Sequence, residues 1–564
     1  MFVHLHNHTH YSLLDGLIKI PDLVKKAKEY NMPALAITDH GNMYGAVEFY
    51  QECQKQDIKP IIGVEVYVAA RSRFDKEPRI DSRRYHLTLL AKNETGYRNL
   101  IKLVTKANLE GFYYKPRVDW ELLQDHTKGV ICLSGCMGGQ LSRLLLNKDH
   151  AGAEKLARDY AEAFGPDNYY IEIMHHPKIE GQIELAKNLI ALARKLNLPL
   201  VATHDTHYLN KDDSRAHHTL LAIQTGNDVD DVKGVTNMEE DFSFVSAEEM
   251  ASFFPDTPDA LENTLKISEA CNLELVLGKF VFPNFELDDD KTADEVLRQL
   301  AFSGLAKRGL DKDEAAISRL NHELEVIKIK GYASYFLVVE DLIRFARENN
   351  IYYNIRGSVA GSLTTYSLDI TKVNPLAYHI PFERFLNPER PSAPDIDMDF
   401  ADNKRDKIID YAKQKYGGEK VAQIGTFGTM MARGSVRDVA RALGFPYQAG
   451  DQIAKLIPMG SQGFPMTIDR ALEMVPELKE MYNERADTKE IIDMAKKIEG
   501  CARHISVHAA GVVIAPAPLD QYVPLQYDPK GVSVITQYDM YSVGEDGVGL
   551  TKFDFLGLRN LAIL

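Results

Sequence analysis

Four histidines alternate with other residues near the start of the chain, at His4, His6, His8 and His10 of HLHNHTH. Side chains two positions apart share one face of an extended strand, so this spacing predicts four imidazoles on one face. A His-x-His pair lets two imidazoles reach one metal ion. Asp15 follows in the next turn. The pattern indicates a metal site.

More potential ligands follow the later apolar runs of the first 210 residues. A lone histidine or acid at a strand end is more often structural, and that interpretation is the alternative for each of them. Together with HLHNHTH they make six such places at the same edge of successive strands, which are hard to produce by chance, so we predict a metal cluster. The residues are Asp39 and His40 in ITDHGN, Glu65 in GVEVY, His86 in YHLTLL, Cys136 in LSGC, and Asp205 and His207 in THDTHY.

A second acidic pattern is PDIDMDF, in which Asp395, Asp397 and Asp399 alternate. On a strand the three carboxylates share one face. Negative charges held so near one another repel and destabilise the fold unless cations neutralise them. Two hard cations such as Mg²⁺ would do so and would polarise a triphosphate for phosphoryl transfer. The alternative is a solvated acidic edge strand.

A Gly-Ser turn, Gly357-Ser358, follows a strand-like segment upstream of PDIDMDF. Such a turn offers backbone N–H groups and a hydroxyl to phosphate oxygens, although alone it is a weak signal. A third carboxylate on another strand would complete the pattern. Asp554 in KFDFLGLR is the candidate, with Lys552 two residues earlier on the same face.

Strands and helices must position these groups. Short apolar runs alternate with amphipathic stretches over the first 210 residues, which predicts a parallel sheet, open or closed into a barrel, with its active edge at the strand C-termini. The expected strands are 34–38, 59–70, 87–91, 129–134, 169–174 and 198–203, and the expected helices include 21–30, 151–164 and 182–196.

The character of the sequence changes at 275–295, where a proline and a run of acids suggest a linker. The remainder is predicted to mix helices with a few short strands. The expected helices are 293–307, 313–330, 404–416, 433–443 and 486–499, and the expected strands are 511–515 and 532–537.

Composition bounds the class of protein. The 564 residues carry a net charge of −15 and 45% hydrophobic residues, which is ordinary for a soluble multidomain protein. Five scattered cysteines favour a reducing compartment. No apolar run is long enough for a membrane helix, and the first residues lack a secretory signal. We expect a cytoplasmic protein without membrane contact.

Three motifs of the first 210 residues resemble the PHP family: HxHxxxSxxDG (6–16), TDHGN (38–42) and the closing DxH (205–207). The resemblance implies a distorted (β/α)7 barrel holding up to three metal ions for phosphoester hydrolysis. Such ligands favour zinc or manganese over magnesium. The resemblance implies as ligands His6, His8, Asp15, His40, Glu65, His86, Cys136, Asp205 and His207.

The whole chain resembles the C-family replicative polymerases, the bacterial DNA polymerase III alpha subunits. GYASYFLVVEDLI, FERFLNPER, PDIDMDF, GTFGTM, HAAGVVIAP and KFDFLGLR carry the resemblance, in that family's order. It implies an α/β multidomain protein: a PHP domain (1–275), a DNA polymerase beta-like nucleotidyltransferase palm of α+β type (276–432 and 511–564) and an inserted helical thumb (433–510).

The same resemblance assigns roles in DNA synthesis with Mg²⁺. Spacing alone does not choose between Asp395 and its neighbours, whereas the family motif selects the second and third aspartates of PDIDMDF. The implied catalytic residues are Asp397, Asp399 and Asp554; the implied nucleotide contacts are Gly357, Ser358, Arg384, Arg390 and Lys552.

A basic helix supports DNA binding. Between 401 and 445 there are 9 Lys and Arg against 5 Asp and Glu, a local charge of 9 − 5 = +4. Arg433, Arg437 and Arg441 recur every four residues and therefore share one helix face. A charged face is usually just solvated, which is the alternative. Beside a polymerase-like site we expect these arginines to follow the phosphates of DNA.

The expected substrates are primer–template DNA and deoxynucleoside triphosphates, with a 3′–5′ exonuclease as one role for the PHP site. The family's sliding-clamp and clamp-loader contacts lie in C-terminal regions, and its fingers also follow the palm, so we expect this chain alone to polymerise poorly. The alternatives are a stand-alone PHP phosphoesterase and a replisome scaffold whose metals only stabilise the fold. Principal replicase and error-prone paralogue are not distinguished.

Overall fold

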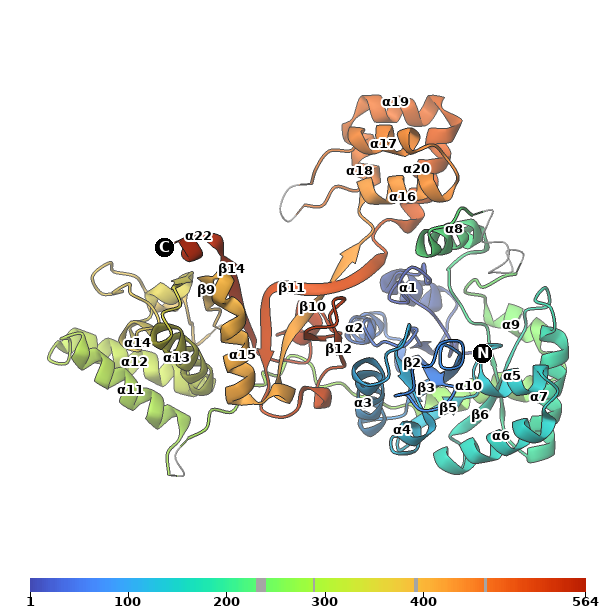
Figure 1. Cartoon of the computed structure of the whole chain (residues 1–564), viewed down its shortest axis with the longest axis horizontal. Coiled ribbons are helices and arrows are strands. Elements are labelled where there is room, and N and C mark those ends of the chain that lie inside the picture. The colour runs from blue at the N-terminus through green and yellow to red at the C-terminus, as the bar shows by residue number, and fades with distance from the viewer. Residues whose placement is uncertain (230–239, 288–289, 390–393, 461–463, 564) are drawn as a thin grey trace. The chain divides into compact units, whose positions relative to one another are not determined.

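The computed structural model describes residues 1–229, 240–287, 290–389, 394–460 and 464–563 (Figure 1). They divide into two compact units. The first unit comprises 1–275, 427–506 and 524–526, and the second comprises 276–426, 507–523 and 527–564. None of the described helices is long and apolar enough to cross a membrane.

The first unit contains a sheet with the strand order β1-β2-β3-β5-β6-β7, and β4 pairs with β2. The expected parallel sheet is corrected here: β3 runs antiparallel to both β2 and β5, whereas β1–β2 and β5–β6–β7 are parallel pairs. The strands are β1 (Ala34–Ile37), β2 (Lys59–Ala69), β3 (Arg84–Ala91), β4 (Arg117–Val118), β5 (Val130–Leu133), β6 (Tyr169–Met174) and β7 (Leu200–Thr203).

The HLHNHTH segment lies between the two ends of this sheet. The Ala36 N–H donates to the His4 carbonyl on the β1 side, and the His8 N–H donates to the Thr206 carbonyl just after β7. Isolated bridges replace the regular strand that we expected. The histidines also do not share one environment: His4 Nε2 donates to the Val245 carbonyl, and His10 Nδ1 accepts from the Ala502 N–H.

Helices complete the first unit, and those after residue 427 form a group of their own in the cartoon (Figure 1). A continuous apolar core, with Leu220 of α8 and Val436 of α16 fully buried, joins this group to α8. The helices are α1 (Ile20–Glu29), α2 (Ala46–Gln56), α3 (Glu94–Leu109), α4 (Trp120–Gln124), α5 (Gln140–Leu146), α6 (His150–Phe164), α7 (Gln182–Leu196), α8 (Ser214–Thr225), α9 (Ala247–Phe253), α10 (Pro258–Ala270), α16 (Ala432–Ala442), α17 (Tyr447–Leu456), α18 (Ile468–Met474), α19 (Pro476–Glu484) and α20 (Ala486–Ile498).

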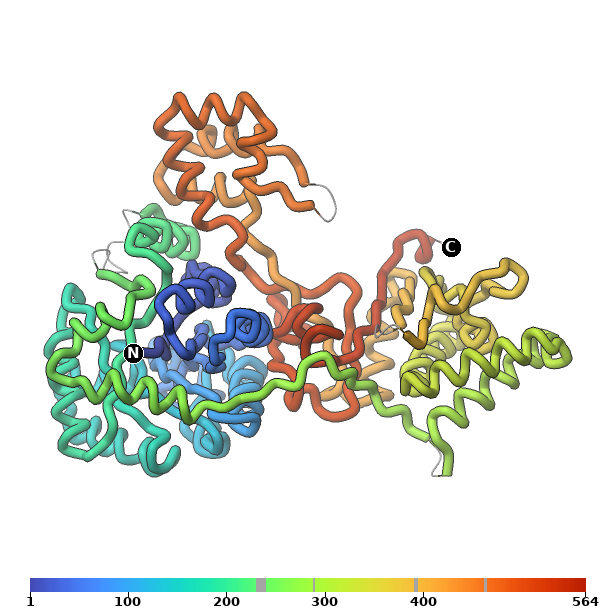
Figure 2. Tube along the Cα trace, turned by 180° about the vertical axis from the view of Figure 1, so that it is seen from behind, coloured from blue at the N-terminus to red at the C-terminus, as the bar shows by residue number. Residues whose placement is uncertain are grey.

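The chain passes from the first unit to the second without regular structure between α10 and residue 287, which the tube in Figure 2 shows as an extended run. The second sheet then has the order β12-β13-β10-β11-β14-β9-β8. Its strands are β8 (Tyr353–Arg356), β9 (Asp397–Ala401), β10 (Val421–Thr429), β11 (Ala502–Ile514), β12 (Leu525–Tyr527), β13 (Val534–Thr536) and β14 (Lys552–Leu558).

Helix α13 (Ala333–Glu348) lies at the centre of the second unit's core, where Phe336 and Val339 are fully buried together with Met398 and Phe555 of the sheet. The other helices are α11 (Ala293–Lys307), α12 (Glu314–Lys330), α14 (Leu363–Ser367), α15 (Arg405–Tyr416), α21 (Met540–Val543) and α22 (Arg559–Ile563). Local signals set their ends: the Asp313 carboxylate caps α12, and Gly331 (φ 72°) ends it.

Candidate functional site

The predicted ligands of the first unit lie together. Eight of the nine fall into small groups whose candidate ligand atoms are within 4.8 Å of one another. These groups come from the HLHNHTH segment and the turn after it, from the loops after β1 and β7, and from β2, β3 and α8. They are His8, His40 and His207; His6, His8 and Asp205; His40, Glu65 and His86; and Asp15 and His207 with His217.

His6, His8 and Asp205 form the most enclosed of these groups. His8 Nε2 lies 3.2 Å and His6 Nε2 3.6 Å from Asp205 Oδ1, and both imidazoles are fully buried. None of the three atoms makes a well-formed hydrogen bond to a described residue. Buried polar atoms are rarely left unpaired, so this donor set fits a metal ion. Burial, followed by neighbouring imidazoles, lowers the pKa of His8 to about 3, so its nitrogen is free to coordinate near neutral pH.

Glu65 connects the remaining ligands. Its carboxylate lies 2.6 Å from His40 Nδ1 and 2.9 Å from His86 Nδ1. Burial alone would raise the pKa of Glu65, but the His86 and His40 imidazoles bring it well below its usual range. Cys136, the ninth predicted ligand, has its Sγ 3.5 Å from His86 Nδ1, and burial together with Glu65 raises its thiol pKa. A metal must therefore displace a proton to bind this sulfur.

Two residues of this site were not predicted from the sequence. Glu172 of β6 is buried, and its Oε1 accepts a 2.7 Å hydrogen bond from His6 Nδ1, which orients that ring. A carboxylate inside the apolar run YYIEIM was the available signal. His217 of α8 lies 3.6 Å from Asp15 Oδ1, and nothing in its helical sequence context distinguished it.

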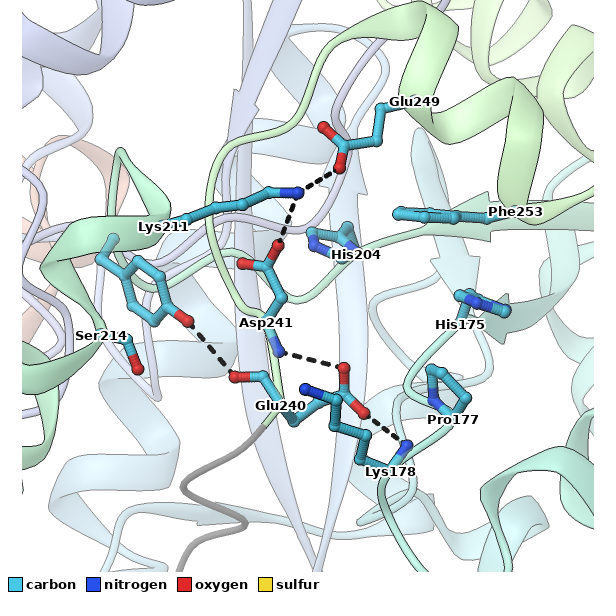
Figure 3. Close-up of a pocket in the computed structure, with 11 residues that line it drawn as sticks. His175, Pro177, Lys178, His204, Lys211, Ser214, Glu240, Asp241, Glu249 and Phe253 are labelled. Carbon is cyan, nitrogen blue, oxygen red and sulfur yellow. Dashed lines mark hydrogen bonds and ion pairs between the residues drawn. The ribbon is translucent and has the colours of Figure 1, made fainter.

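A neighbouring loop fixes the backbone around His207. The His207 N–H donates to the Phe242 carbonyl, and the Tyr208 hydroxyl donates to the Glu240 carbonyl. Figure 3 shows the adjoining pocket of about 410 Å³, in which Lys211 lies 2.5 Å from Glu249 and 3.4 Å from Asp241. These contacts pair the Lys211 ammonium with the Glu249 and Asp241 carboxylates and hold the loop in place.

A second acidic group lies in the second unit. Asp554 of β14 is directly opposite Asp397 of β9 in a parallel pair. The candidate ligand atoms of these two residues and Asp395 are within 4.8 Å of one another. Asp554 Oδ1 is buried and has no hydrogen-bond partner among the described residues, so this group also fits a cation. Partial desolvation of its carboxylate, followed by the charges of Asp397 and Asp554, raises the pKa of Asp395, with Lys552 opposing this rise.

Asp399 lies apart from this group. Its fully buried carboxylate is engaged by Arg356 of β8 through two hydrogen bonds of 2.5 and 2.9 Å. Arg356 lies opposite Asp397 in the antiparallel pairing of β8 with β9. Its guanidinium therefore reaches diagonally across the two strands to Asp399, the next residue of β9 on the same face. In this structure the carboxylate cluster therefore contains Asp395 in place of the predicted Asp399.

Two of the predicted nucleotide contacts, Gly357 and Lys552, lie next to the acidic group. Gly357 has φ 93°, a conformation that favours glycine, and the exposed Ser358 follows it. Lys552 Nζ lies 2.7 Å from Asp554 Oδ2, and Arg384 is exposed. Arg390 lies outside the described residues.

The three arginines of α16 differ in their surroundings. Arg433 donates to the Ile457 carbonyl, and Arg437 pairs with Asp451 at 3.0 Å. Arg441 is exposed. The three arginines therefore share one face of α16, but the guanidinium groups of Arg433 and Arg437 bind other residues of the first unit.

Two segments of the chain match known protein families. Residues 4–176 match the PHP domain, and residues 295–557 match the bacterial DNA polymerase III alpha NTPase domain. The chain is 41% identical to the DNA polymerase III subunit alpha of Thermus aquaticus, over 100% of this chain and 51% of the relative. For the subunit of Borreliella burgdorferi the identity is 42%, over 100% of this chain and 49% of the relative.

The two groups of candidate metal ligands thus lie in a PHP-like segment and in a polymerase III alpha-like segment. Over its whole length the chain is similar to bacterial DNA polymerase III alpha subunits, which confirms the resemblance inferred from its motifs. It spans about half the length of the curated relatives that it matches.

Proposed function

We propose that this chain carries the nucleotidyl-transfer centre of a template-directed DNA polymerase, with primer–template DNA and deoxynucleoside triphosphates as substrates. One observation carries the proposal. Within the segment that matches the polymerase III alpha NTPase domain, Asp397 of β9 and Asp554 of β14 lie opposite each other, and the buried Oδ1 of Asp554 has no hydrogen-bond partner among the described residues. In this proposal 276–432 and 511–564 form the palm and 433–510 the thumb.

Each residue of the proposed palm has a defined task. Asp397, Asp399 and Asp554 would hold two Mg²⁺ ions, which would supply the positive charge that neutralises the triphosphate and lowers the pKa of the primer hydroxyl. The Gly357-Ser358 turn directs backbone N–H groups and a hydroxyl at the phosphate oxygens. Lys552 balances the acidic group. The primer 3′ hydroxyl gives up its proton to water, and its O3′ bonds to the α-phosphorus as the bond to the departing pyrophosphate oxygen breaks. Binding and orientation are therefore the protein's main contribution.

We also propose that residues 1–275 form a PHP domain with the distorted (β/α)7 barrel of that family and hydrolyse phosphoesters. The hydrogen bonds from the HLHNHTH segment to both edges of the first sheet support closure of the barrel. The nine ligands listed above would hold Zn²⁺ or Mn²⁺, which supplies an activated water. Glu172 orients the His6 imidazole, and the enclosed floor of the site limits the access of bulk water. Removal of 3′-terminal nucleotides is the role that we propose for this site.

Primer extension tests the polymerase proposal. Because the chain spans half of its relatives, the assay uses a chimera in which it replaces the matching part of the Thermus aquaticus subunit. Asp397→Asn is expected to lower extension by at least roughly 10²–10³-fold. Asp406→Asn is the matched control, since Asp406 is 92% exposed on α15. Equal activity of the two variants contradicts the proposal and favours a stand-alone PHP phosphoesterase.

A further inference from the structure

The ion pair between Arg356 and Asp399 is unusual for its location. Asp399 is a proposed ligand of a catalytic cation, yet its side chain is fully buried and both its oxygens are bound by one guanidinium. A paired carboxylate of this kind is strongly held, because two charge-assisted hydrogen bonds act together in a fixed geometry. Arg356 and a metal ion therefore compete for the same two oxygens.

Arg356 and Asp399 differ in how firmly the surrounding structure fixes their side chains. The Arg356 side chain is 50% exposed, so the guanidinium can move into solvent with little packing lost. Asp399 is confined to β9, where Asn354 faces it on one side and Leu556 on the other. If Arg356 left, a buried carboxylate would remain beside the acidic cluster and without a counter-charge. A cation is the natural replacement.

We propose that Arg356 is a positioning residue that serves as a displaceable counter-ion: it holds Asp399 out of the carboxylate cluster until a divalent cation takes its place. This inference rests on the proposed polymerase function, and it explains why Asp395 replaces Asp399 in the cluster of this structure. The freed guanidinium directly precedes the Gly357-Ser358 turn, where the triphosphate is proposed to bind.

Titration with Mn²⁺ alone tests the proposal on the 564-residue chain. The readout is ion binding followed by electron paramagnetic resonance, with neither nucleotide nor DNA. The PHP ligands are the same in every variant, so differences between the isotherms report on the palm. Arg356→Gln is expected to bind Mn²⁺ about tenfold more tightly there. Arg356→Lys, which keeps the charge but loses the double hydrogen bond, is expected to show a smaller gain.

Two comparisons separate this mechanism from a general charge effect. Lys407→Gln removes the same charge from an exposed position of α15 and is expected to leave Mn²⁺ affinity unchanged. In an Asp399→Asn background, Arg356→Gln is expected to lose its gain, because the gain acts through that carboxylate. A gain that persists in this background, or no gain in either Arg356 variant, overturns the proposal. Since no nucleotide is present, failure of the primer-extension test leaves this result standing.

Discussion

Asp554 lies directly opposite Asp397 in the parallel pairing of β14 with β9. The β14 strand also pairs with β11, where Gly511 faces Asp554. The cluster therefore depends on strand register, because a slip by one residue would turn Asp554 to the other face of the sheet. This is how two carboxylates from distant parts of the chain come to lie next to each other.

The first prediction ranks the three aspartates of PDIDMDF. In the chimeric polymerase, Asp399→Asn is expected to lower primer extension nearly as far as Asp397→Asn, because Asp399 joins the metal ligands once Arg356 is displaced. Asp395 is exposed and precedes β9, so Asp395→Asn is expected to cost less than about tenfold. The reverse order of effects would show that the cluster in this structure is itself the working ligand set.

A second prediction concerns the loop that follows the Gly-Ser turn. The buried carboxylate of Glu323 accepts hydrogen bonds of 2.9 Å from the Ser362 hydroxyl and from the Leu363 and Thr364 N–H groups, and Arg319 pairs with it at 2.8 Å. Breaking a buried, paired carboxylate costs about 3–5 kcal/mol, so Glu323→Gln is expected to lower the free energy of unfolding by an amount near this range.

Denaturant unfolding monitored by circular dichroism measures this loss. Glu325→Gln provides the control, since Glu325 is exposed on the same helix and the change is chemically identical. If both variants unfold at the wild-type denaturant concentration, Glu323 does not anchor the loop.

The sequence predicted those parts of the molecule that local patterns determine. Periodicity located β6 and α7 to the residue, and the PHP motifs named ligands that the structure brings together. The direction of β3 was predicted wrongly, because a short buried run has the same composition in parallel and antiparallel pairs. The partners of Asp399 and His6 were also beyond local patterns: Arg356 and Glu172 reach them only through tertiary register and packing.

A third prediction concerns the residues that orient His6, a proposed metal ligand. Glu172 accepts hydrogen bonds from His6 Nδ1, from the Thr203 hydroxyl and from the Gly135 N–H. Removing such an orienting carboxylate typically costs about 10–100-fold in metal affinity, and Glu172→Gln is expected to weaken Zn²⁺ binding by that factor. Competition with a chelating dye measures it. Glu184→Gln on the surface of α7 is the control, and equal affinities in the two variants would contradict the role of Glu172.

A fourth prediction concerns acid stability. Burial lowers the pKa of His4 from 6.5 to about 4, with its hydrogen bond to Val245 opposing the shift. Between pH 6.5 and 4 the unfolded chain therefore binds a proton that the folded protein excludes, so stability falls as the pH falls through this window. The loss in the free energy of unfolding is about 3 kcal/mol at most. His4→Gln is expected to flatten the decrease in melting temperature between about pH 7 and 4.5. A decrease as steep as that of the wild type would exclude His4 as a contributor.

The last prediction tests the PHP site as a nuclease. The substrate is a 5′-labelled primer with a mispaired 3′ end, incubated with the chain and Mn²⁺ without nucleotides. Stepwise shortening is expected, with loss on addition of EDTA and in His6→Ala, because His6 Nε2 faces the enclosed group with Asp205. His150→Ala, at an exposed position of α6, and Asp397→Asn, in the other compact unit, are both expected to keep the activity. Shortening that survives in His6→Ala would assign the activity elsewhere. If bound metal is measured but no shortening occurs, the PHP residues stabilise the fold, and phosphate chemistry belongs to Asp397, Asp399 and Asp554.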